Sequence, residues 1–149
     1  MGLSLLALVT PPLAVLLAGR RLSGGARLAL VVTVVVTWCV AVALCLLLGG
    51  MDDIGAILMF IFVVLPMIGS LVAAGVAARL VQGRGLFVSA WALALVGWYA
   101  GLAIMMLLEP SRRTLGEPAL SWAVVTAFPV VYASSAAVLG AGLAGRRVS

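Results

Sequence analysis

Histidine and lysine are absent from this chain of 149 residues, and charged residues of any kind are scarce. The absence of histidine removes the most common metal ligand, a frequent haem ligand and the usual general base. Only 9% of the residues are charged and 66% are hydrophobic, whereas a soluble domain carries about a quarter charged residues. Too few polar side chains remain to cover a water-soluble fold of this length. The composition therefore predicts an integral membrane protein.

Cysteine is also rare, and the two that occur, Cys39 and Cys45, lie in one apolar run. On a helix their spacing separates them by about 9 Å along the axis, so a disulfide between them is not expected. We interpret both as small apolar fillers of a membrane helix. Because no nucleophile and base pair or metal cluster is apparent, we expect neither a cofactor nor enzymatic activity.

Long stretches without charge divide the rest of the chain. Four of them lie between Arg27 and Asp52, between Asp53 and Arg79, between Arg84 and Glu109, and between Glu117 and Arg146. Each exceeds the roughly 20 residues that cross the hydrocarbon core of a bilayer. A shorter apolar segment precedes them, and it contains two adjacent prolines, Pro11 and Pro12.

The first segment is open to three interpretations: a signal peptide, a re-entrant hairpin or a further span. No basic residue precedes it, which disfavours a signal peptide. We therefore predict an all-α polytopic bundle with 1–149 as a single transmembrane domain. Its five spans are expected at 3–19, 28–49, 54–78, 86–108 and 119–144, with four spans as the alternative if the first segment re-enters.

The nine arginines are distributed unevenly over the connections between these spans. One side of the membrane receives Arg20, Arg21, Arg27, Arg79, Arg84, Arg146 and Arg147. The other side receives Arg112 and Arg113, together with Asp52, Asp53, Glu109 and Glu117. Because cytoplasmic loops retain basic residues, the N-terminus is predicted outside and the C-terminus in the cytoplasm. The arginines gather on no single face, so we expect no nucleic-acid partner.

The bias toward Ala, Gly, Val, Leu and Arg is typical of a GC-rich genome. We therefore expect a multi-pass protein of a cell membrane, the bacterial cytoplasmic membrane, with membrane lipids as its surroundings.

Two stripes of small residues recur at helical spacing. The fourth predicted span carries Ala90, Ala94, Gly97 and Gly101, and the fifth carries Ala133, Ala137, Gly140 and Ala144. Such stripes let two helices approach closely and gain dispersion contacts inside a bilayer. We expect them to be packing faces, either within one chain or between copies, and the two stripes are candidate counterparts.

No predicted span contains an ionisable Asp, Glu, Lys, Arg or His, which disfavours ion-coupled pumping by this chain alone. Prolines lie near the middle of alternate spans, at Pro11, Pro12, Pro66 and Pro129. Each frees a backbone carbonyl that needs a partner in the bilayer. The hydroxyls nearby belong to Ser70, Tyr132, Ser134 and Ser135. They form a possible mid-membrane polar site, or they accompany ordinary proline kinks.

Trp98 and Tyr99 also lie near mid-depth, where their N–H and O–H groups need partners. The available hydroxyls belong to Thr33, Thr37, Ser70, Tyr132 and Ser134. We expect these polar groups to form an internal cluster or to line a small cavity. Trp91 lies closer to the predicted cytoplasmic end and suits an interfacial belt.

Trp38 and Trp98, and likewise Pro66 and Pro129, recur at an offset of about 60 residues. This pattern indicates either a repeated helical hairpin or a chance likeness between apolar helices.

The segment Leu6–Leu17 reads Leu-Ala-Leu-Val-Thr-Pro-Pro-Leu-Ala-Val-Leu-Leu, and a short loop and a helix with Trp38 follow it. This start resembles the stress-induced proteolipid membrane-potential modulators, which begin with a similar Pro-Pro helix. The resemblance covers about a third of the chain, and the Ile-Pro-Gly of that family is missing from the second helix. It implies a membrane-embedded start and carries over no functional residue.

These features favour a non-enzymatic membrane protein that acts through helix–helix contacts. We expect an accessory subunit or a self-associating assembly, with a homo-oligomer or another membrane protein as partner. The alternative is a small transporter or channel for a neutral or apolar solute, with its site between the proline-kinked first, third and fifth spans.

Overall fold

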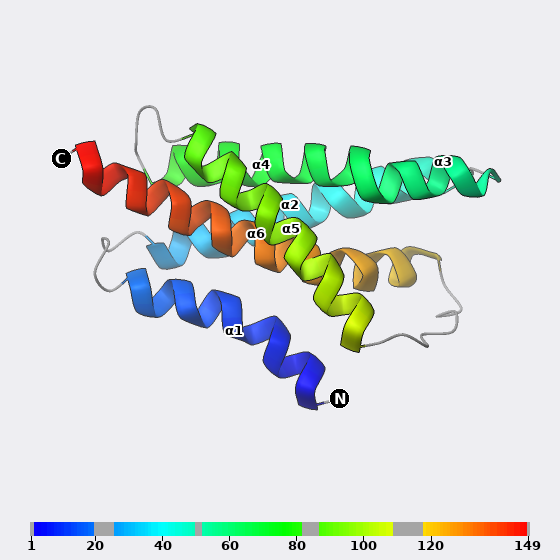
Figure 1. Ribbon diagram of the computed structural model, residues 1–149, viewed down its shortest axis with the longest axis horizontal. Coiled ribbons are helices and arrows are strands. Elements are labelled where there is room, and N and C mark those ends of the chain that lie inside the picture. The colour runs from blue at the N-terminus through cyan, green and yellow to red at the C-terminus, as the bar shows by residue number, and fades with distance from the viewer. Residues whose placement is uncertain (1, 20–25, 50–51, 82–86, 109–117, 149) are drawn as a thin grey trace.

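The computed structural model describes residues 2–19, 26–49, 52–81, 87–108 and 118–148 (Figure 1). Every secondary-structure element in these ranges is a helix, which confirms the all-α prediction. The helices are α1 (Gly2–Gly19), α2 (Ala26–Leu48), α3 (Ile54–Met59), η1 (Phe60–Val64), α4 (Leu65–Leu80), α5 (Phe87–Leu108) and α6 (Pro118–Val148). The elements α3, η1 and α4 follow one another without a break and form one long helix.

Within the described ranges, four helices are long and apolar enough to cross a membrane: Arg27–Leu48, Ile54–Leu80, Phe87–Leu108 and Trp122–Leu143. The first helix, α1, is also apolar but shorter. It is a single helix that runs through Pro11 and Pro12, so Gly2–Gly19 does not fold as a re-entrant hairpin. Its 18 residues extend about 27 Å at a rise of 1.5 Å per residue, slightly less than the hydrocarbon thickness.

Successive long helices run in alternating directions, and α6 lies among the others (Figure 1). In its apolar window 56% of the residues are buried, against 28–33% in the other three long helices. Consequently α6 is the axis of the bundle, and α1, α2, α4 and α5 all pack against it.

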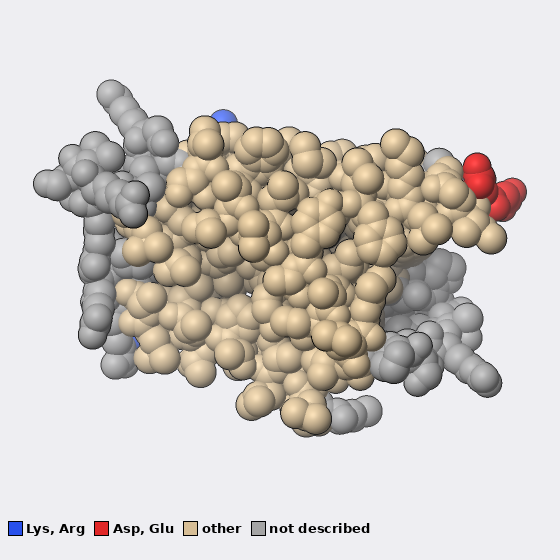
Figure 2. All heavy atoms as spheres, in the orientation of Figure 1, with Lys and Arg blue, Asp and Glu red and all other residues tan. Residues whose placement is uncertain are grey.

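The charged residues that the structure describes lie at the ends of this bundle. Asp52 and Asp53 precede α3 at one end, whereas Arg27 lies in the first turn of α2 and Arg79 in the last turn of α4 at the other. Figure 2 shows the acidic atoms at one extremity and an uncharged surface between the two ends. This separation leaves a continuous apolar band around the middle of the molecule.

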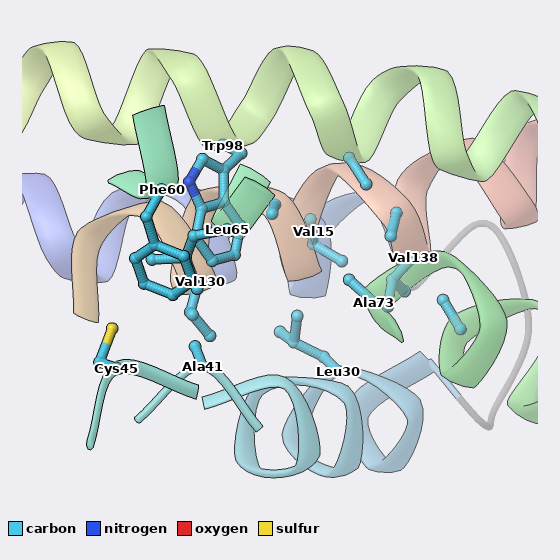
Figure 3. Packing of buried hydrophobic residues seen from close by; sticks show 14 residues of the cluster. Val15, Leu30, Ala41, Cys45, Phe60, Leu65, Ala73, Trp98, Val130 and Val138 are labelled. Carbon is cyan, nitrogen blue, oxygen red and sulfur yellow. The ribbon is translucent and has the colours of Figure 1, made fainter. Parts of the chain in front are cut away.

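The core consists of small and medium apolar side chains around α6. Val130 and Val138 of α6 lie beside Leu30 and Ala41 of α2 and near Ala73 of α4 (Figure 3). In a bilayer the hydrophobic effect between helices is weak, so close packing has to supply dispersion contacts. The many buried alanines permit that approach.

The helix that contains Pro66 departs from α-helical geometry one turn before the proline. The amide of Leu65 donates to the carbonyl of Phe60, five residues earlier, which is the hydrogen bond of a π-helix. Proline has no N–H and its ring crowds the preceding turn. The sequence left an ordinary proline kink or a broken helix at a binding site open at Pro66, and the structure shows the π-helix η1 one turn before it.

Cys39 and Cys45 are both free, as their spacing predicted. Trp38 and Trp98 have different environments: Trp38 is 40% exposed and Trp98 is 1% exposed. The indole N–H of Trp38 donates to the carbonyl of Ala123, at 3.2 Å, whereas the ring of Trp98 lies against Gly69. These two positions of the suspected repeat therefore play different roles.

Candidate functional site

Two glycines of α5 lie directly against the backbone of α6. A Cβ atom added at Gly97 would lie 2.7 Å from the carbonyl oxygen of Tyr132. A Cβ added at Gly101 would lie 2.7 Å from the carbonyl oxygen of Phe128. These distances are shorter than any normal van der Waals contact, so only glycine permits this approach of the two helices.

The remaining small residues of the two stripes extend the same contact. Ala90, Ala94, Ala133 and Ala137 are fully buried, and Gly140 of α6 lies against the backbone of Ala90. The side chain of Ala144 lies outside the described part of the chain. The stripes therefore face each other within one chain, and this face is not available to a second copy.

The hydroxyl of Tyr99 has a backbone partner in a neighbouring helix. It donates to the carbonyl oxygen of Phe62, at 2.7 Å. Phe62 precedes Pro66 by four residues, so in a regular α-helix its carbonyl would accept from residue 66, which has no N–H. Tyr99 thus satisfies a carbonyl that the proline deprives of its usual donor, and the hydroxyl acceptors expected from the sequence are not its partners.

Tyr132 makes the same kind of bond on the other side of α6. Its hydroxyl donates to the carbonyl oxygen of Ala7, at 3.1 Å, and Ala7 precedes Pro11 by four residues. The chain has two tyrosines, and both bind carbonyls that lie four residues before a proline in another helix. This relation attaches α1 to α6 and the Pro66 helix to α5.

The four hydroxyls of the predicted mid-membrane site do not converge on one point. Ser70 accepts from the indole N–H of Trp91 on α5, at 3.1 Å, and donates to its own helix at Met67. Tyr132 binds α1, as described above. Ser135 donates to Val131 within α6, at 2.8 Å. Three of the four hydroxyls are therefore occupied by protein partners.

Ser134 is the exception, since its hydroxyl is buried without a hydrogen-bond partner. The hydroxyl of Thr37 on α2 shares this property. Thr33 instead donates to the carbonyl of Ala29 in its own helix. The tryptophan assignment also changes, because Ser70 accepts from Trp91 rather than from Trp98.

Sequence reasoning missed the divergence of Ile54–Val64 from the bundle, and we call this range the diverging segment. No Cα atom in it lies within 8 Å of a Cα atom in α1, α2, α5 or α6. Within it Phe60 alone is buried. Figure 1 shows α3 at the far end of the molecule, away from α5 and α6. The position of Pro66 was a signal for the change of helical geometry before it, which the structure shows as the π-helix η1.

A cavity of about 30 Å³ lies between the diverging segment and the bundle, and we call it the wedge cavity. It is lined by Cys45, Leu48, Gly49, Ile57, Phe60 and Trp122. A water molecule requires about 10–15 Å³ by this measure, so the wedge cavity accepts only a narrow group. Among the residues that the structure describes, no three His, Cys, Asp or Glu side chains are grouped to hold a metal ion.

Comparison with known proteins adds no assignment to this geometry. No family model matches the chain, and no curated protein or solved structure shows a significant similarity to it.

Proposed function

We propose that this chain is a non-enzymatic, multi-pass membrane subunit that acts through helix–helix contacts with another chain. The partner is a second copy or a different membrane protein, and α1 is a fifth span. The proposed location is a cell membrane, the bacterial cytoplasmic membrane, with the C-terminus in the cytoplasm. The arrangement of Arg27 and Arg79 at one end and Asp52 and Asp53 at the other supports this orientation through the positive-inside rule.

The observation that carries the proposal is the diverging segment. Its apolar side chains Leu58, Met59 and Val63 are between 49% and 62% exposed. The Tyr99 hydroxyl reaches the Phe62 carbonyl, but no Cα atom of α1, α2, α5 or α6 lies within 8 Å of a Cα atom in the segment. Elsewhere the bundle closes through small-residue contacts. A partner helix beside the diverging segment would supply the dispersion contacts that this half of the span lacks.

The small-residue stripes do not provide that partner surface, because they are buried between α5 and α6. The proposed contact with a partner chain therefore lies on the half-helix before Pro66 and not on helix α5. The transport alternative has less support, because the hydroxyls of Ser70, Tyr132 and Ser135 bind protein groups and no solute path through them is apparent.

Site-specific photo-crosslinking in native membranes tests this proposal. A benzophenone amino acid is placed at Met59, in the diverging segment, or at Leu107, which is 80% exposed on α5 at the same end of the bundle. We expect a discrete protein adduct from the first position, at twice the chain mass or at the mass of one partner. The control position should yield lipid adducts. Lipid adducts alone from both positions would refute the proposal.

A further inference from the structure

The diverging segment is joined to α4 by an unusual stretch of helix. In η1 the amide of Leu65 donates to the carbonyl of Phe60, five residues earlier, and Pro66 supplies no N–H to the turn before it. The carbonyl of Phe62 accepts from Tyr99 of α5 instead, at 2.7 Å. π-helical turns inside α-helices are rare and are frequent at functional sites. Backbone hydrogen bonds therefore link the two halves of this helix less completely than in a regular α-helix.

The bundle holds the diverging segment by few contacts. No Cα atom of α1, α2, α5 or α6 lies within 8 Å of a Cα atom in it, and among its residues Phe60 alone is buried. The ring of Phe60 reaches the central core (Figure 3). Segments with few buried contacts move at a low cost in free energy. The diverging segment can thus change position while the rest of the bundle stays folded.

The wedge cavity is a gap on one side of this segment. On the side of the bundle its lining includes Leu48, Gly49 and Trp122, and on the side of the segment it includes Ile57 and Phe60. The volume of about 30 Å³ exceeds that of one water molecule, about 10–15 Å³ by this measure. Side chains that line an apolar void lose the dispersion contacts that a filled space would give them. A movement of the segment toward α2 and α6 would recover those contacts.

Two contributions oppose each other in such a movement. In the position that the structure shows, which we call the open position, the Tyr99 hydroxyl satisfies the Phe62 carbonyl. A swing toward α2 and α6 closes the wedge cavity but draws this carbonyl away from α5, so the hydrogen bond breaks. The net worth of one hydrogen bond and the dispersion contacts of a few side chains are similar in size. The open and closed positions are therefore close in free energy.

We propose that the diverging segment swings about η1 between the open position and a closed position, and that the hydrogen bond from Tyr99 to Phe62 holds it open. In the closed position Ile57 packs against Leu48 and the wedge cavity disappears. The movement involves this chain alone, so it does not depend on the proposed helix partner. A partner beside the exposed side of the segment would favour whichever position fits it better.

Pulsed electron paramagnetic resonance on the purified chain in nanodiscs tests this movement. Cys39 and Cys45 are first replaced by alanine. Spin labels at Ile54→Cys on α3 and Leu107→Cys on α5 form the hinge pair, and these positions are 74% and 80% exposed. The control pair combines Leu47→Cys on α2, also 80% exposed, with Leu107→Cys. Only the hinge pair has η1 between one label and the bundle.

We expect two distances for the hinge pair and one for the control pair. Tyr99→Phe should raise the ratio of closed to open positions roughly fivefold, as expected for the loss of one hydrogen bond of ordinary strength. Pro66→Ala restores the missing N–H and should leave a single distance. A single distance for the hinge pair before these changes, or the same spread in both pairs, would overturn the proposal. An unchanged ratio in Tyr99→Phe would do so as well.

Variants at the wedge cavity separate closure from general looseness. Cys45 lines the wedge cavity and is 1% exposed. Cys45→Leu puts a larger side chain into the gap and should leave only the open distance, whereas Cys45→Ala should keep both. Gly49→Ala is a smaller filler, because its added Cβ lies 3.4 Å from the nearest atom, and should lower the closed fraction. Equal ratios in all three proteins would contradict closure of the cavity, and an unchanged control pair verifies that each variant is folded.

Discussion

The hydroxyl of Tyr99 donates to the carbonyl of Phe62, and this carbonyl loses its usual α-helical donor because Pro66 has no N–H. A broken backbone bond is costly in a bilayer, where water cannot replace it. The Tyr99 side chain from α5 restores the bond, so the helix with Pro66 is tolerated beside a helix whose tyrosine reaches this carbonyl.

This relation predicts a coupling between Tyr99 and Pro66. Tyr99→Phe should lower the free energy of unfolding by about 1 kcal/mol, since the Phe62 carbonyl then has no donor. In a Pro66→Ala background the restored amide can serve that carbonyl, and the same change should cost much less. Unfolding in a graded detergent series measures all four proteins of the cycle. Equal costs in both backgrounds would show that the bond does not compensate for the proline.

A second prediction concerns the attachment of α1. Tyr132→Phe removes the hydrogen bond to the Ala7 carbonyl without changing the ring that packs at this contact. Amide hydrogen exchange in α1 should become faster, while exchange in α5 should stay the same. Thr10→Ala is a suitable control, because the Thr10 hydroxyl bonds within α1 to Leu6. If both variants behave alike, Tyr132 does not hold α1 in place.

The contact between α5 and α6 predicts a sharp difference between glycines. Gly97→Ala places a methyl group against the Tyr132 carbonyl and should destabilise the fold by about 2 kcal/mol through overpacking. Gly75→Ala meets only Phe87, at 4.0 Å, and should be neutral or slightly stabilising because alanine favours helix. Thermal unfolding of both variants checks the order, and a Gly97→Ala protein as stable as the wild type would exclude this packing.

The buried serines give a fourth comparison. Ser70→Ala leaves the Trp91 indole N–H without its acceptor and should cost about 1 kcal/mol. Ser134→Ala removes a buried hydroxyl that has no partner, so it should be neutral or stabilising. Both variants can be followed by tryptophan fluorescence during unfolding. A larger loss from Ser134→Ala would indicate a polar partner for that hydroxyl that the structure does not contain.

Much of the architecture was accessible from the sequence because charges interrupt the chain at regular intervals. The charge-free stretch between Arg27 and Asp52 contains α2 almost completely, since the bilayer thickness sets helix length. Glycine spacing likewise indicated close helix contacts at Gly97 and Gly101. The two stripes were recognised as candidate counterparts, but periodicity alone does not say whether the neighbour belongs to the same chain.

The polar details were harder to predict, because they depend on which helices become neighbours. Free carbonyls at the prolines were expected from the sequence. Their partners, Tyr99 and Tyr132, could not be predicted, because they depend on how helices far apart in sequence align with one another. The predicted site at Ser70, Ser134 and Ser135 assumed that nearby depth means a shared cavity. Side chains of α4 and α6 at the same depth in the membrane point toward different neighbouring helices, so a shared depth did not bring their hydroxyls to one site.

The central claim is that this chain works in contact with another chain along the diverging segment. The native mass of the complex, released from membranes into nanodiscs and measured with its co-purifying proteins, tests it most directly. The account predicts a defined assembly heavier than the 15.2 kDa protomer, which Leu58→Arg in the diverging segment should dissociate and Leu47→Arg on α2 should leave intact. A lone protomer at every concentration, with no co-purifying protein, would contradict it.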